Sequence, residues 1–179
     1  MREMKDRPDL RPDRETYSAV IKACERQKWS ADVFGEACQW YSDAEAAGIY
    51  APWSDDGMKP DLHGFSVPEA RVALTHTLCS YTEGTRPLPT EELIVVTGRG
   101  KHSEEGRGVL RHVAPQFFES QGIEVFSETG PDKNAGRIYV PRMEIEKWIE
   151  RSQSQWRLRG FEYSEYFDHM RWVHGVPHG

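Results

Sequence analysis

The sequence contains no long hydrophobic run and few cysteines, and both absences restrict what the protein can be. No stretch of about 18 apolar residues occurs, so no membrane-spanning helix is expected. Residues 1–14 alternate acids and bases without an apolar segment, which excludes a secretory signal and is too acidic for a typical organellar transit peptide. Either the protein acts where it is made, or a targeting segment is missing from this stretch. The cysteines Cys24, Cys38 and Cys79 have no C-x-x-C spacing and cannot all pair, which favours buried thiols in a reducing compartment.

Two nucleotide-binding signatures and the usual zinc signatures are also absent. The stretch VVTGRGKHS (95–103) fails the Walker A pattern, because Val95 stands where the first glycine belongs and His102 where Ser or Thr is required. It fails the G-x-G-x-x-G fingerprint because Ser103 replaces the third glycine. The seven histidines and three cysteines are scattered along the chain and match none of the usual four-ligand zinc patterns. Nucleotide binding by either device and a zinc site are therefore not expected.

The composition is that of a polar globular protein. Hydrophobic residues make up 37% and charged residues 29% of the 179 positions, which allows one ordinary domain plus extensions. The formal net charge is −6, so the molecule as a whole is not a generic polyanion binder. Any nucleic-acid contact must come from a local basic patch.

The N-terminal third predicts two helices. After the charged lead-in of residues 1–14, a helical pattern starts at Glu15, and a second helix is expected over about 31–47, ended by Gly48. The residues on their apolar faces are Tyr17, Val20, Ile21 and Cys24, and then Val33, Phe34, Ala37, Cys38 and Tyr41. The two helices form an αα-hairpin over 15–49, and the Pro- and Gly-containing stretch 50–59 is a linker by composition.

The sequence then changes to an α/β pattern with the order β-α-β-α-β-β over residues 60–141. A strand at DLHGF (61–65) precedes a helix that Ser66 and Glu69 begin as a capping box. ELIVV (92–96) is a near-continuous apolar run and predicts a strand buried on both faces. A helix to about Ser120 follows, in which Pro115 predicts a kink or a late start, and IEVFSE (123–128) and RIYV (137–140) predict two short strands.

Residues 142–179 are expected to form a C-terminal helix and an aromatic tail. Ile145, Trp148, Ile149 and Trp156 line one side of the helix. The aromatic residues of the tail, which either pack on the domain or stack on bases, are Phe161, Tyr163, Tyr166, Phe167 and Trp172.

The glycine-rich loop after the strand 92–96 is suited to hold a phosphodiester. Gly98 and Gly100 follow Thr97 and allow backbone N–H groups to converge close to a helix N-terminus. Four cations in this stretch face only two carboxylates, those of Glu104 and Glu105. The candidate nucleic-acid-binding residues are Thr97, Gly98, Arg99, Gly100, Lys101, His102, Ser103, Arg107 and Arg111. A solvated basic loop without a ligand is the alternative.

DLHGF supplies the candidate catalytic pair. Asp61 and His63 lie two apart on a strand, so both side chains project from one face while Leu62 enters the other. A carboxylate beside an imidazole fixes its tautomer and raises its basicity, which suits general acid–base work. The pair could instead ligate a metal, or complete a structural hydrogen-bond network.

DLHGFSVPEARVAL, then VVTGRGKHS, GVLR and NAGRIYV, together resemble a small MutS-related (Smr) domain over about residues 60–141. The family's LDLH strand reads Pro60-Asp61-Leu62-His63 here, with Pro60 in place of the customary leucine, and its TGxG loop is intact at 97–100. The resemblance implies a fold similar to the C-terminal domain of bacterial translation initiation factor three. It also implies nucleic-acid binding and, as in several members, endonuclease activity on DNA or RNA, with roles for the LDxH and TGxG positions.

The hairpin 15–49 resembles a pentatricopeptide repeat, and LRPDRETYSAVIKAC resembles the end of one repeat and the start of the next. A single repeat cannot bury its own faces, so the chain looks like the C-terminal part of a longer array or a remnant of one. Fusion of such repeats to an Smr domain implies base-by-base choice of single-stranded RNA. It also implies action in a plastid or mitochondrion, with the cytoplasm as the alternative.

Three functions follow as hypotheses. The first is an endonuclease that grips RNA, or DNA, at 98–103 while His63 moves a proton, with Mg²⁺ at Asp61 left open. The second is an RNA clamp without catalysis. The third is a protein-interaction domain, which the acidic net charge favours.

Overall fold

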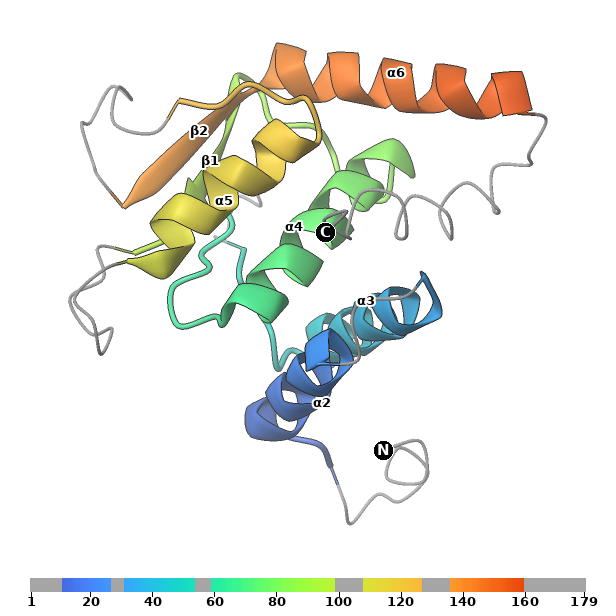
Figure 1. The fold of residues 1–179 in the computed structure, drawn as a ribbon. Helices are drawn as coiled ribbons and strands as arrows, with labels where there is room; N and C mark the ends of the chain where they lie inside the picture. Colours follow the sequence, from blue (N-terminus) through green and yellow to red (C-terminus); the bar gives the residue numbers. More distant parts are fainter. Residues whose placement is uncertain (1–10, 27–30, 54–58, 99–107, 127–135, 160–179) are drawn as a thin grey trace.

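The computed structural model describes residues 11–26, 31–53, 59–98, 108–126 and 136–159. Its helices and strands are α2 (Arg14–Arg26), α3 (Ala31–Ala46), α4 (Val67–Thr82), β1 (Glu92–Val96), α5 (Val109–Ser120), β2 (Arg137–Pro141) and α6 (Arg142–Arg159). Figure 1 shows how they are arranged. The predictions made for most of the glycine-rich loop (99–107) and for base stacking by the aromatic tail (160–179) lie outside the described residues. The part that is described combines helices with a small sheet and is compatible with an α/β fold.

The predicted helical hairpin is present as α2 and α3, which pack against each other. Asp13 caps α2: its carboxylate accepts the Thr16 backbone N–H at 2.8 Å and the Thr16 hydroxyl at 2.6 Å, and these bonds lower the pKa of Asp13. After the end of α3, Gly48 has a φ of 70° and donates its N–H to the Glu45 carbonyl at 2.9 Å. Because a glycine adopts this left-handed conformation without a side-chain clash, it ends the helix as predicted.

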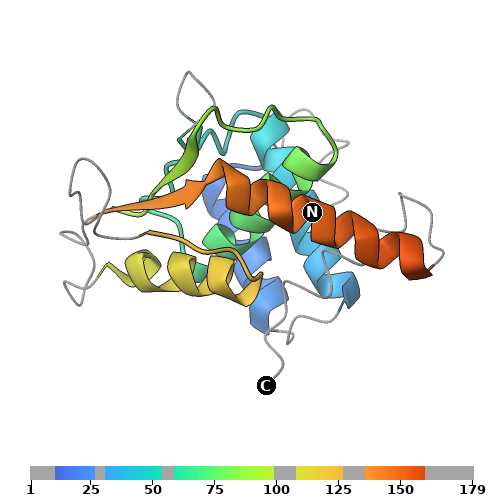
Figure 2. The same cartoon turned by 90° about the horizontal axis from the view of Figure 1, so that it is seen from above.

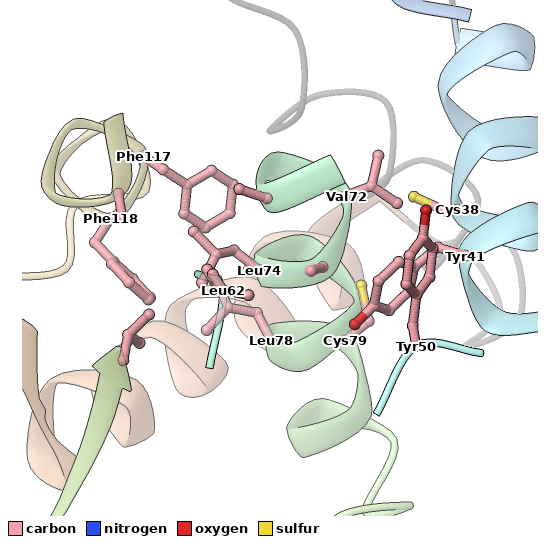
Figure 3. Close-up of a cluster of buried hydrophobic side chains, with 14 of the residues drawn as sticks. Cys38, Tyr41, Tyr50, Leu62, Val72, Leu74, Leu78, Cys79, Phe117 and Phe118 are labelled. Carbon is pink, nitrogen blue, oxygen red and sulfur yellow. The ribbon is translucent and has the colours of Figure 1, made fainter. Parts of the chain in front are cut away.

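Helix α4 is the centre of the molecule. The predicted capping box begins it: the Glu69 carboxylate accepts the Ser66 backbone N–H at 2.7 Å and also the Ser66 hydroxyl. Side chains on nearly every side of α4 are buried, so it packs against α3 and α2 as well as α5 and α6. Figure 3 shows Leu74 and Leu78 of α4 between Phe118 of α5 and Tyr41 of α3.

The strands β1 and β2 are antiparallel, with Ile94 opposite Tyr139. Residues 60–62 pair in parallel with the end of β1 through the bridge Asp61–Val96, and Phe126 bridges Tyr139 on the outer side of β2. Two expectations need correction. In β1, Leu93 and Val95 are buried, whereas the alternating residues are only half-buried, so one face is covered fully and not both. The predicted strand IEVFSE contributes a single bridge, at Phe126, among its described residues.

The hairpin and the α/β part share one hydrophobic core. Tyr50, in the stretch whose composition suggested a linker, is 1% exposed and stacks on Tyr41 with ring centroids 5.4 Å apart. Its hydroxyl donates to the buried Glu69 carboxylate at 2.7 Å, so it joins the hairpin to the first turn of α4. A second link is Glu45 of α3, which accepts hydrogen bonds from Trp53 at 3.0 Å and Arg86 at 3.1 Å.

Helices α5 and α6 complete the structure. Pro115 lies inside α5, which begins at Val109, so of the two predicted alternatives, a kink or a late start, the late start is wrong. Ile145 and Trp148 of α6 are buried as predicted, whereas the side chain of Trp156 lies outside the described part. Figures 1 and 2 show α6 on the side of the molecule away from α2 and α3. The three cysteines are buried thiols. None of the helices that the structure describes has the length and apolar character of a membrane span.

Candidate nucleic-acid interface

The candidate site starts where residues 60–62 run beside the end of β1. The Leu62 N–H donates to the Val96 carbonyl at 2.8 Å, and the Val96 N–H donates to the Pro60 carbonyl at 2.9 Å. This pairing uses the carbonyl of Pro60 and never needs an N–H from it, which explains how a proline takes the position of the customary leucine. Leu62 is 1% exposed, and its side chain anchors the segment in the hydrophobic core.

The strand predicted over 61–65 is wrong beyond Leu62, because a tight turn carries His63 out of the sheet. The Phe65 N–H donates to the Leu62 carbonyl at 3.0 Å, and Gly64, the third residue of the turn, has a φ of 78°. A positive φ at this position is the mark of a type II turn and favours glycine. His63 therefore sits at the tip of the turn, where its side chain is 73% exposed.

Asp61 holds the imidazole of His63 in place. One carboxylate oxygen, Oδ1, lies 2.7 Å from His63 Nδ1 and also accepts the backbone N–H of His63 at 2.9 Å. The backbone contact fixes the turn, and the ring contact favours the tautomer with its hydrogen on Nδ1. Nε2 is then the ring nitrogen with a lone pair for proton transfer.

Gly98 lies directly beside His63. It follows β1, has a φ of 78°, and a Cβ built on it would stand 3.4 Å from the Cβ of His63. Because residues 60–62 and β1 are parallel, their C-terminal ends meet at one edge of the sheet. The two segments that the sequence analysis singled out are thus brought together at the first residues of the glycine-rich loop.

The other predicted loop residues divide into three groups. Thr97 is 5% exposed, and its N–H and hydroxyl donate to the Gly136 carbonyl at 2.9 and 3.2 Å, so it ties the end of β1 to the start of β2. Arg111 is half-buried in the first turn of α5. Arg99, Gly100, Lys101, His102, Ser103 and Arg107 lie outside the described residues.

Metal binding at Asp61 was left open by the sequence. Among the described side chains, no group of three His, Cys, Asp or Glu residues is arranged to hold a metal ion. Asp61 is 40% exposed, and one carboxylate at the surface suffices for a Mg²⁺ that also takes substrate phosphate oxygens and water. The described residues therefore fit a Mg²⁺ ion that Asp61 would hold together with substrate phosphate oxygens and water, and they include no site built from protein ligands alone.

Three neighbours of the site were missed by sequence reasoning. Gly64 could have been recognised, since a glycine directly after an extended segment is a turn signal. Gly136, which receives both donors of Thr97, and Arg14, whose guanidinium reaches the Gly64 carbonyl at 3.4 Å, are far away in the chain. No local pattern indicates such contacts.

Comparison with known proteins supports one family. An Smr domain-containing protein of Schizosaccharomyces pombe is 30% identical over 128 residues, which cover 69% of this chain. This similarity supports an Smr domain. The chain spans 58% of that relative's length, and the matched stretch is longer than the roughly 80 residues between positions 60 and 141. No family model and no solved structure matches the chain, and the pentatricopeptide-like repeat stays a prediction.

Proposed function

We propose that the protein binds nucleic acid, with single-stranded RNA as its expected partner and DNA as the alternative, and cleaves a phosphodiester beside His63. The observation that carries this proposal is the position of Gly98 against His63, whose ring Asp61 orients. We further propose that residues 60–62, α4, β1, α5, residues 123–126 and β2 correspond to the β-α-β-α-β-β order of Smr domains. The similarity to a fungal Smr domain-containing protein supports both statements.

The reaction uses His63 as a general base. Asp61 Oδ1 accepts a hydrogen bond from His63 Nδ1, and the two atoms lie 2.7 Å apart. Nε2 takes a proton from the attacking oxygen. That oxygen, from water or from a ribose 2′-hydroxyl, forms a bond to phosphorus while the bond to the leaving oxygen breaks. The leaving oxygen takes a proton from solvent. Bound Mg²⁺ at Asp61 would lower the pKa of its water and neutralise phosphate charge.

Incubation of the purified chain with labelled single-stranded and duplex RNA and DNA, with and without Mg²⁺, tests the proposal on a gel. His63→Ala should abolish cleavage and leave binding nearly intact. The matched control is His112→Ala, since His112 is an exposed histidine of α5. The chemistry of the product ends separates the two nucleophiles, because only the 2′-hydroxyl gives a cyclic phosphate. Cleavage that survives in His63→Ala would refute the catalytic assignment.

A clamp without catalysis is the second candidate. It is favoured by the exposure of His63 and Asp61, 73% and 40%, because acid–base groups act best where water is excluded. This reading predicts retention of RNA at low salt and no product under any metal condition. Failure to retain nucleic acid at all would favour a protein-interaction domain instead. Base-by-base RNA choice by a pentatricopeptide-like hairpin, and action in a plastid or mitochondrion, belong to this proposal as expectations of the resemblance.

A further inference from the structure

The turn that presents His63 contains one residue with unusual backbone freedom, Gly64. Before the histidine, the Leu62 N–H is bonded to Val96 of β1, and after it the Phe65 N–H closes the turn on the Leu62 carbonyl at 3.0 Å. Gly64 lies between these two fixed points with a φ of 78°. Because a glycine backbone adopts more conformations than any other, the direction of the imidazole depends on what holds Gly64.

Arg14, the first residue of α2, holds Gly64 from the N-terminal hairpin. Its Nη2 donates to the Gly64 carbonyl at 3.4 Å and lies 3.8 Å from the position that a Cβ on Gly64 would take. The guanidinium carbon lies 5.2 Å from the centroid of the Phe65 ring and 5.6 Å from that of the Tyr50 ring. A hydrogen bond of 3.4 Å is long, so the contacts with the two rings add to what keeps the guanidinium in place.

The same face of α2 makes a second contact with this region. Ser18 follows Arg14 by one helical turn, and its hydroxyl hydrogen-bonds to the Glu69 carboxylate. Glu69 is 2% exposed and begins α4 by accepting the Ser66 backbone N–H at 2.7 Å. The place of Arg14 beside Gly64 is therefore set by the packing of the hairpin on the start of α4.

We propose that Arg14 is a positioning residue for His63, on which it acts through the backbone of Gly64 and the ring of Phe65. The proposal rests on the proposed function and extends it: a residue of the hairpin, 50 positions before Gly64, sets the direction in which the turn presents the imidazole. A general base is effective only when its lone pair meets the proton that it removes, so a turn that is free to move would slow the chemical step. Because Arg14 is exposed, the competing roles are direct contact with a substrate phosphate and a contribution to folding alone.

The first measurement is the kinetics of RNA cleavage by the native full chain, Arg14→Ala and Arg14→Lys. Arg14→Ala should lower kcat about tenfold and leave KM within about twofold of the native value, because the base is displaced while substrate binding is unchanged. Arg14→Lys keeps the positive charge but loses the planar guanidinium that lies against the two rings, so its kcat should stay low. If Arg14→Ala raised KM and the lysine variant restored it, Arg14 would be a phosphate contact and the positioning role would be wrong.

The second measurement is hydrogen exchange followed by NMR, which needs no cleavage. In Arg14→Ala, the Phe65 N–H that closes the turn should exchange about three- to tenfold faster, and a smaller share of the His63 rings should carry their hydrogen on Nδ1. The Leu62 N–H, which is bonded to Val96 in the sheet, should exchange at the native rate. Equal acceleration of both N–H groups would show a role in folding alone, and an unchanged Phe65 N–H would show that Arg14 does not hold the turn.

Lys22→Ala is the matched control, because it removes the same charge from an exposed position of α2 about two turns beyond Arg14. It should leave kcat and the exchange of the Phe65 N–H as in the native chain, and losses equal to those of Arg14→Ala would assign the effect to charge and overturn the proposal. Cleavage with an unchanged kcat in Arg14→Ala overturns the positioning role and leaves the proposed function intact. A native chain that cleaves neither RNA nor DNA refutes the proposed catalysis, whereas faster Phe65 exchange in Arg14→Ala would still assign the hold on the turn to Arg14.

Discussion

Gly98 and His63 come from different segments, yet a Cβ on Gly98 would stand 3.4 Å from the Cβ of His63. This distance is ordinary van der Waals contact, so the backbone that leaves β1 passes close beside the histidine. The contact makes the first residue of the glycine-rich loop a wall of the candidate site. It also means that a change at Gly98 acts on His63 directly.

Replacement of Gly98 by alanine should impair both folding and nucleic-acid binding. Its φ of 78° costs a non-glycine residue about 1–2 kcal/mol, and the new methyl group meets His63. Gly84→Ala is the matched control, because Gly84 has a φ of 68° and nothing within 4 Å of its Cβ position. Thermal melts should show a loss of stability in both variants, and anisotropy with RNA a loss of affinity in Gly98→Ala alone. Equal affinity losses in the two would remove the special role of the His63 contact.

Asp61→Asn should show whether Asp61 orients the His63 ring without itself contributing to RNA binding. An amide oxygen can still accept the His63 backbone N–H, but the carboxylate charge beside Nδ1 is lost. Because this pair is largely exposed, stability should change by less than about 1 kcal/mol. We expect the cleavage rate to fall at least tenfold while the affinity for RNA is unchanged. A variant that cleaves at the native rate would show that Asp61 does not position the base.

Glu69→Gln should change how stability depends on pH. Burial alone would raise the pKa of Glu69, but hydrogen bonds from Ser66, Tyr50 and Ser18 together lower it below its ordinary 4.5. Stability from this carboxylate is therefore present above pH 4.5 and is lost as the pH falls through the folded-state pKa. Urea unfolding at pH 7 should show a loss of about 1–3 kcal/mol in the variant.

Between pH 5 and 3, the free energy of unfolding should fall less steeply for Glu69→Gln than for the native chain. The control is Glu15→Gln, which changes an exposed acid in the first turn of α2 and should leave the pH dependence of unfolding as in the native chain. If the free energy of unfolding fell equally steeply below pH 5 for the native chain and for Glu69→Gln, the assignment of the stabilising charge to Glu69 would be wrong.

Thr97→Val should act through stability. The substitution removes the hydroxyl that donates to the Gly136 carbonyl at 3.2 Å but keeps the backbone bond at 2.9 Å. Since that carbonyl retains one donor, the cost should be about 0.5–1.5 kcal/mol in urea unfolding. Thr97→Ser keeps the hydroxyl and serves as the control. If Thr97→Val instead lost RNA affinity at native stability, Thr97 would be a contact residue.

Local sequence patterns predicted the helices well because their causes are local. The αα-hairpin, the capping box of Ser66 and Glu69, and the stop at Gly48 all depend on residues within a few positions of one another. The Asp61–His63 pair is also local, although it forms across a turn and not along a strand face as predicted. These features could therefore be derived before any coordinates were known.

The contacts that build the site were harder to derive because they join distant segments. The apolar run of β1 suggested two covered faces, whereas β2 pairs with it antiparallel and only alternate residues are buried. The parallel pairing of residues 60–62 with β1 is too short to show in a pattern. Arg14 reaches the Gly64 carbonyl across 50 positions, so no local pattern indicated this contact.

The packing of α2 and α3 on α4 has a consequence for how the chain is made. On the ribosome the hairpin emerges before α4, but Ile21 and Tyr41 are covered only in the assembled core, which also needs the buried side chains of α4. The roughly 36 residues from the end of α3 to the end of α4 take about 2–7 s to synthesise at 5–20 residues per second. During those seconds the hydrophobic face of the nascent hairpin is exposed, and this is the interval in which a chaperone would bind it.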